Sequence, residues 1–206
     1  MTTPMEMARA EREDFAALLD ELTPDQWESP TLCEGWRVRD VVAHAFGYDN
    51  LSRAQLVGRF IKGGLMVNRI NELGVVELAQ SSPAALRDLV RNHLEPRGLT
   101  AGFGGRIALT DNMIHQQDIR RPLGMPRRIP SERLRTALDF ARYAPTIRGA
   151  WQARGVRMVA DDLAWSHGRG PEVRGSGEAL LMMMGGRRAA LDDLSGPGQP
   201  KLAQRF

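Results

Sequence analysis

The pattern of apolar and polar positions over the first two thirds of the chain is typical of helices. Apolar residues recur at helical spacing, and the periodic stretches are separated by loops rich in Gly and Pro. The Thr-Pro-Asp sequence at 23–25 predicts a short helical turn that holds Trp27. The longer predicted helices cover residues 5–22, 38–60, 65–78, 83–94, 106–121 and, with Ser131 as its cap, 131–143.

The pattern changes after residue 145. Val156, Met158 and Ala160 alternate with their neighbours, which predicts a strand, and residues 172–174 form a second strand candidate. A final helix is expected over 177–194. The fold class predicted from these elements is α+β, mainly α. We expect a four-helix bundle in residues 1–130 and a small α/β part in residues 131–206.

Composition narrows the class of protein. Of the 206 residues, 42% are hydrophobic and 26% are charged, which is ordinary for a globular domain. No apolar run approaches the roughly 20 residues of a membrane helix, and the charged start does not resemble a secretory signal. The single cysteine, Cys33, cannot form an internal disulfide, so we expect a cytoplasmic protein. The net charge is +3 without a zinc-finger or RNA-binding motif, so neither nucleic acid nor membrane is an expected partner.

The predicted helix over 106–121 carries an unusual set of side chains on one face. At helical spacing from Ile107, the inward positions are Asp111, Ile114, His115 and Asp118. Burying unpaired charges is costly, so three ionisable groups on a core face favour a partner such as a metal ion. Asp111 and His115 are four residues apart and are therefore neighbours on the helix surface.

His44 is the candidate third ligand. It borders the apolar face of the predicted helix 38–60, at a depth of roughly 10 Å from the helix start, against roughly 13 Å for His115 in its own helix. In an up-and-down bundle the two side chains could meet in the core. Two histidines and a carboxylate leave a coordination position open, as in catalytic zinc sites. Spacing alone leaves a second interpretation open, in which both histidines are hydrogen-bonded core residues and Asp111 is solvated.

Three segments of the chain form motifs that occur in a fixed order. The first is Trp27-x-x-Pro30-Thr31-x-Cys33-x-Gly35-Trp36-x-Val38-x-Asp40-Val41-Val42-Ala43-His44, and the second runs from Asp111 through His115 to Gly124. The third comprises Asp161 to Gly175, Gly186-Arg187 and Leu194 to Gly198. In this order the three segments resemble the family of mycothiol-dependent maleylpyruvate isomerases, within the DinB-like group of metal-binding helical bundles. The resemblance covers residues 5 to 198.

The resemblance implies a divalent metal, expected to be Zn²⁺, held by His44, Asp111 and His115. The family pattern has Glu where this chain has Asp111, which has one methylene less and reaches less far. It also implies mycothiol, the small thiol of actinobacteria, as cosubstrate. A metal stabilises a thiolate, which would add to the double bond of a maleyl-type acid in an isomerase, or attack another electrophile in a transferase.

Supporting roles follow for three further residues. Asp118 and Asp40 could each orient a ligand histidine, and Arg187 could face an anionic substrate. The alternative for each carboxylate is a position on the helix face, paired with a nearby Arg, and the alternative for Arg187 is a solvated surface position. A non-catalytic binding or regulatory protein on the same scaffold, and a hydrolase that uses metal-bound water, are the alternative functions. The expected partners are a small-molecule thiol and an electrophilic substrate, and a homodimer is compatible with the sequence.

Overall fold

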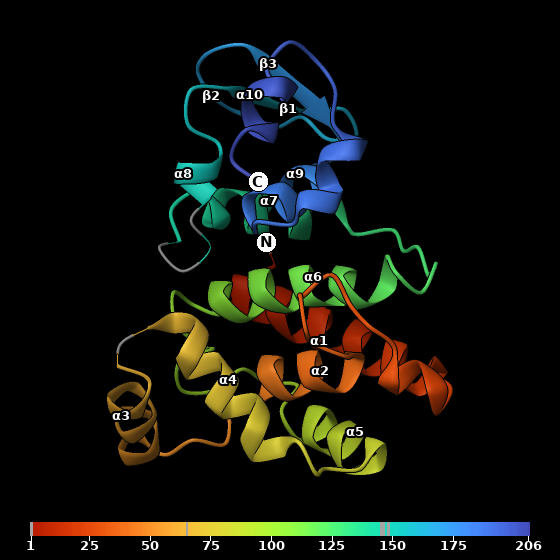
Figure 1. Cartoon of the computed structure of the whole chain (residues 1–206), viewed down its shortest axis with the longest axis vertical. Helices are drawn as coiled ribbons and strands as arrows, with labels where there is room; N and C mark the ends of the chain where they lie inside the picture. Colours follow the sequence, from red (N-terminus) through yellow and green to blue (C-terminus); the bar gives the residue numbers. More distant parts are fainter. Residues whose placement is uncertain (1, 65, 145–146, 148) are drawn as a thin grey trace. The chain divides into compact units, whose positions relative to one another are not determined.

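Most of the described chain is helical in the computed structural model, which describes residues 2–64, 66–144, 147 and 149–206 (Figure 1). The chain divides into two units, Met1–Pro126 and Arg127–Phe206. The predicted class, mainly α with a small α/β part, is confirmed. No helix among the described residues has the length and apolar character needed to cross a membrane. The first unit contains α1 (Pro4–Glu21), the 3₁₀ turn η1 (Asp25–Glu28), α2 (Val38–Phe46), α3 (Arg53–Lys62), α4 (Val67–Leu78), α5 (Pro83–Asn92) and α6 (Arg106–Arg120).

Four helices, α1, α2, α5 and α6, form the predicted bundle of the first unit. α1 packs along α6 and against α5, and α2 packs against α5 and α6 (Figure 1). Phe15 of α1 meets Phe46 of α2 edge to face, with 5.4 Å between ring centroids. The predicted short helical turn that holds Trp27 is present as η1, and the Trp27 side chain is fully buried against the same core. Residue 65, where one predicted helix begins, lies outside the described residues.

The prediction of a single helix over residues 38–60 is wrong, because two helices, α2 and α3, occupy this part of the chain. α2 ends at Phe46, and α3 begins after Ser52, whose hydroxyl caps it by accepting a hydrogen bond from the backbone N–H of Gln55. The turn between the helices contains Asp49, which pairs in the interior with Arg12 of α1. Helical periodicity gives no sign of such a distant partner, so the break could not be read from it.

α6 is enclosed on more sides than the single face that its spacing predicted. All side chains from Asn112 to Ile119 are buried. Its polar residues face partners on α1: Asn112 Oδ1 accepts a hydrogen bond from Arg12 Nε at 2.8 Å, and Gln116 Nε2 donates to Glu11 Oε1 at 2.7 Å. These bonds allow polar side chains into the centre of the bundle. They also fix α6, which carries three of the predicted site residues.

The second unit is a small α/β structure. It contains α7 (Ser131–Ala141), α8 (Gly149–Gln152), β1 (Arg157–Ala160), β2 (Ser166–Gly168), β3 (Glu172–Gly175), α9 (Gly177–Met184), the 3₁₀ helix η2 (Arg188–Asp193) and α10 (Gln199–Ala203). The sheet has the order β2-β1-β3, with β1 antiparallel to β2 and parallel to β3. The buried faces of β1 and β3, including Met158 and Val173, pack with the apolar α9.

Three details of the second unit differ from the prediction. β2 was not predicted, since its three residues are too short to show alternation. The predicted helix 177–194 ends at Met184, where Gly185 caps it and Gly186 takes a φ of 84°, a left-handed conformation that glycine adopts without strain. Ser131 is not a cap but the first residue of α7, after Pro130.

Candidate metal site

Two histidines from different helices meet inside the bundle. His44 lies on the second turn of α2 and His115 in the third turn of α6, and their rings stand edge to face with 4.9 Å between centroids. Both are more than nine-tenths buried. The structure therefore brings together the two histidines whose similar depth in their helices suggested a meeting.

Asp111 completes a group of three possible ligands. It lies one turn before His115 on α6, with 3.5 Å between its Oδ1 and His115 Nε2. One ligand atom from each of His44, Asp111 and His115 lies within 4.8 Å of the others. Donors on one zinc ion, each about 2.0–2.2 Å from the metal, lie at most about 4.4 Å apart. Two imidazoles and one carboxylate so placed fit a divalent ion after small side-chain adjustments. The Asp111 side chain is 39% exposed, so the group is open on this side.

Asp118 holds the other side of the His115 ring. Its Oδ2 lies 2.9 Å from His115 Nδ1, and the carboxylate is completely buried. A carboxylate bonded to one ring nitrogen fixes the imidazole so that the other nitrogen faces the ligand group. The structure thus places Asp118 where the sequence suggested an orienting role.

The charge around His115 favours its protonated form. Burial acts to lower the pKa of His115, but the carboxylates of Asp111 and Asp118 outweigh it and raise the pKa well above its ordinary value. A cation at this position, whether a proton or a metal ion, is therefore favoured by its surroundings. The two carboxylates on α6 thus stabilise a positive charge on His115, whereas the sequence argument had predicted a partner such as a metal ion for the three ionisable groups.

Aromatic rings surround His44 and restrict its orientation. The Trp36 ring, from the loop before α2, lies 5.1 Å from the His44 ring, and the Tyr48 ring, just after α2, stands edge to face at 6.0 Å. The Tyr48 hydroxyl donates a hydrogen bond to Asn71 Oδ1 of α4 at 2.7 Å. Burial raises the pKa of Tyr48. These contacts hold one ligand candidate from two sides.

Sequence reasoning missed one neighbour of the site. Cys33, which the sequence analysis used only to exclude an internal disulfide and as a motif residue, has its Sγ 3.1 Å from Asp118 Oδ2 and 3.8 Å from His115 Nδ1. Its 85-residue separation from Asp118 leaves no local spacing signal. The only hint was that Cys33 belongs to the same motif as His44.

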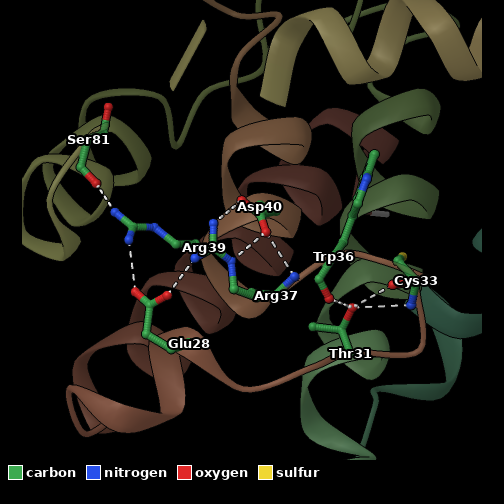
Figure 2. A network of polar contacts seen from close by, with 8 residues as sticks. All are labelled: Glu28, Thr31, Cys33, Trp36, Arg37, Arg39, Asp40 and Ser81. Carbon is green, nitrogen blue, oxygen red and sulfur yellow. Dashed lines mark hydrogen bonds and ion pairs between the residues drawn. The ribbon is translucent and has the colours of Figure 1, made fainter. Parts of the chain in front are cut away.

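Two other candidates lie elsewhere. The Asp40 carboxylate accepts hydrogen bonds from the backbone N–H and Nε of Arg37, at 2.9 and 3.0 Å, and caps the start of α2 (Figure 2). This local pairing is the alternative that the sequence offered for Asp40. Arg187 belongs to the second unit, where its Nη1 donates a hydrogen bond to the carbonyl of Gly185. Its role toward a substrate remains a prediction.

Comparisons with known proteins agree with the resemblance seen in the motifs. The family model described as "Mycothiol maleylpyruvate isomerase N-terminal domain" matches residues 8–97. No curated protein sequence matches the chain significantly. A crystal structure of a histidine-to-alanine mutant of mycothiol-dependent maleylpyruvate isomerase is similar, with 17% identity, 95% of this chain and 92% of that chain covered, and a TM-score of 0.65. A second crystal structure of mycothiol-dependent maleylpyruvate isomerase has 14% identity, the same coverage and a TM-score of 0.55. At these identities the two structures show a shared fold.

Proposed function

We propose that the chain is a mycothiol-dependent isomerase or S-transferase that requires a divalent metal, because residues 8–97 match the family model of the mycothiol maleylpyruvate isomerase N-terminal domain. The observation that carries the proposal is the meeting of His44, Asp111 and His115, with Asp118 bonded behind His115. The match to the family model supports the thiol, and the side-chain group offers a place for the metal.

The donor set suits zinc. Two imidazoles and a carboxylate are a common set of three protein ligands at catalytic zinc sites. A metal held by His44, Asp111 and His115 would favour the thiolate form of a small thiol, which is otherwise a minor species near neutral pH. The chain's own part is to hold the imidazoles, through Asp118 on one side and the Trp36 and Tyr48 rings on the other.

The proposed reaction is balanced without an oxidant or a reductant. The thiolate sulfur forms a bond to one carbon of the double bond of a maleyl-type acid, and the electron pair passes to the conjugated carbonyl. Rotation about the resulting single bond is followed by loss of the thiolate, which restores the double bond in the trans form. In an S-transferase the sulfur instead keeps its bond to the carbon, and the enolate formed by the addition takes up a proton from water. The acid substrate is anionic, and a role for Arg187 toward a substrate stays a prediction from the sequence alone.

Asp111 in place of Glu bears on the alternative function. A shorter side chain leaves the carboxylate farther from the common point of the two imidazoles, which would weaken the centre. A chain that cannot load a metal would be a non-catalytic binding protein on the same scaffold.

Metal content decides between these functions. Protein supplied with Zn²⁺ and dialysed should hold about one metal ion per chain, and His115→Ala should lose it. His167→Ala, a histidine variant in the second unit, is the matched control and should keep the metal. The loaded protein is then tested for mycothiol-dependent isomerisation of maleylpyruvate, followed by absorbance. A wild type that never binds metal would refute the catalytic proposal.

A further inference from the structure

We propose that Cys33 is a positioning residue of the candidate metal centre: its thiol holds the Asp118 carboxylate, and Asp118 in turn holds the His115 imidazole. The inference rests on the proposed function, since it concerns the same centre. Its consequence is that the chemical identity of residue 33, in a loop 85 residues away from Asp118 along the chain, sets the metal affinity.

The geometry of these three side chains is that of a hydrogen-bonded chain. A single oxygen, Oδ2 of Asp118, lies 3.1 Å from Cys33 Sγ and 2.9 Å from His115 Nδ1. Asp118 is completely buried, so bulk water cannot replace a donor that is removed. The thiol donates weakly, but it fixes the oxygen that orients the ring. Loss of the thiol should therefore change the direction in which His115 Nε2 points.

The same three residues could also hold a metal themselves, since their ligand atoms cluster closely. The distances favour the hydrogen-bonded chain. Two donors on a tetrahedral zinc ion lie about 3.3 Å apart, whereas Asp118 Oδ2 and His115 Nδ1 are 2.9 Å apart, which is an ordinary hydrogen-bond length. Cys33 is accordingly assigned a role behind the ligand, not as a ligand.

The loop that carries Cys33 is built to hold it still. The Thr31 hydroxyl accepts a hydrogen bond from the Cys33 N–H at 3.1 Å and donates to the Trp36 carbonyl at 2.9 Å (Figure 2). The Trp36 N–H bonds back to the Cys33 carbonyl at 3.0 Å. Gly35 between them has a φ of 77°, a left-handed conformation that lets the loop close. The loop therefore presents the thiol in one place.

This loop also touches both histidines of the centre. Its Leu32 N–H donates to the Asp118 carbonyl at 3.1 Å, which docks the loop on α6. Its Trp36 ring packs against His44. One short segment thus orients His115 through Cys33 and Asp118, and His44 by direct ring contact. A rigid loop with two such contacts is well suited to set the separation of the two imidazoles.

The test compares Cys33→Ala with Cys33→Ser. Alanine removes the donor, whereas serine keeps an O–H that can reach a carboxylate. Glu34→Ala, at the exposed neighbouring position, is the matched control for disturbance of the loop. Zn²⁺ affinity is measured by competition with a chromophoric chelator. The visible spectrum of Co²⁺-loaded protein reports the ligand geometry, and thermal unfolding of the metal-free protein reports any loss of fold.

We expect Cys33→Ala to bind Zn²⁺ about tenfold more weakly, at the lower end of the range for partners behind a ligand, and to alter the Co²⁺ spectrum. Cys33→Ser should recover most of the affinity, and Glu34→Ala should match the wild type. Wild-type affinity in Cys33→Ala, a serine variant as weak as the alanine variant, or an equal loss in Glu34→Ala would overturn the inference. A wild type without metal affinity would instead refute the proposed function, so the two failures are distinguishable.

Discussion

Replacing Arg12 by methionine should destabilise the first unit strongly, because its guanidinium is fully buried and donates four hydrogen bonds. Nη1 and Nη2 donate to the two Asp49 carboxylate oxygens at 2.9 and 3.0 Å, Nε donates to Asn112 Oδ1 at 2.8 Å, and Nη1 also donates to the His93 carbonyl at 2.6 Å. The Asp49 side chain is as inaccessible as that of Arg12, with 0% exposed. Arg12→Met therefore leaves a buried carboxylate without its cation.

The size of the effect follows from this burial. Removing one partner of a buried ion pair costs about 3–5 kcal/mol. Asp49 keeps two donors, the Arg97 N–H and the Thr100 hydroxyl, so the lower part of that range is expected. At about 2–4 °C per kcal/mol for a chain of this size, the melting temperature should fall by at least about 6 °C.

The assay is urea unfolding of the metal-free protein, with Arg9→Met as the matched control. Arg9 lies on the same helix, but its ion pairs are exposed and should contribute less than about 1 kcal/mol. The double variant Arg12→Met/Asp49→Asn, which removes both charges, should recover part of the loss. A loss below about 1 kcal/mol in Arg12→Met, or one equal to that of Arg9→Met, would refute the reasoning. Because Asp49 anchors the end of α2, the variant should also bind Zn²⁺ more weakly.

Three further changes test the centre and the second unit. Asp118→Asn should weaken Zn²⁺ affinity about 10- to 100-fold in a chelator competition, and an unchanged affinity would remove its orienting role. Asp111→Glu should keep one metal ion per chain by elemental analysis, whereas Asp111→Ala should lose it; metal retained by Asp111→Ala would exclude this residue as a ligand. Burial and the Arg142 cation lower the pKa of His167, with Asp139 opposing them, so the unfolded chain gains a proton there before the folded one. The free energy of unfolding of the second unit should therefore fall as pH drops below about 6.5. In urea unfolding at a series of pH values, His167→Gln should show a smaller fall in the free energy of unfolding over this range. An equal fall in the variant and the wild type would contradict the assignment.

Local spacing was enough to predict the parts of the site that lie on one element. Asp111, His115 and Asp118 share α6, so the helical repeat alone puts them on neighbouring turns. His44 could be added because its depth in α2 is similar to that of His115 in α6, and the structure brings the two rings to 4.9 Å. The motif around residues 27–44 carried the resemblance to a family whose model matches residues 8–97, although it did not show why Cys33 belongs to the motif.

The buried polar contacts of the first unit that spacing did not predict join residues far apart in the chain. Helical periodicity predicts that a charged residue faces solvent. Arg12 and Asp49 are nevertheless buried, because each balances the charge of the other in an ion pair. Asp49 makes this pair from the turn after α2, where the sequence pattern predicted that the helix continues. Cys33 and Asp118 follow the same rule at the candidate centre. For these residues burial is a property of a pair of positions, which a pattern read along one helix does not contain.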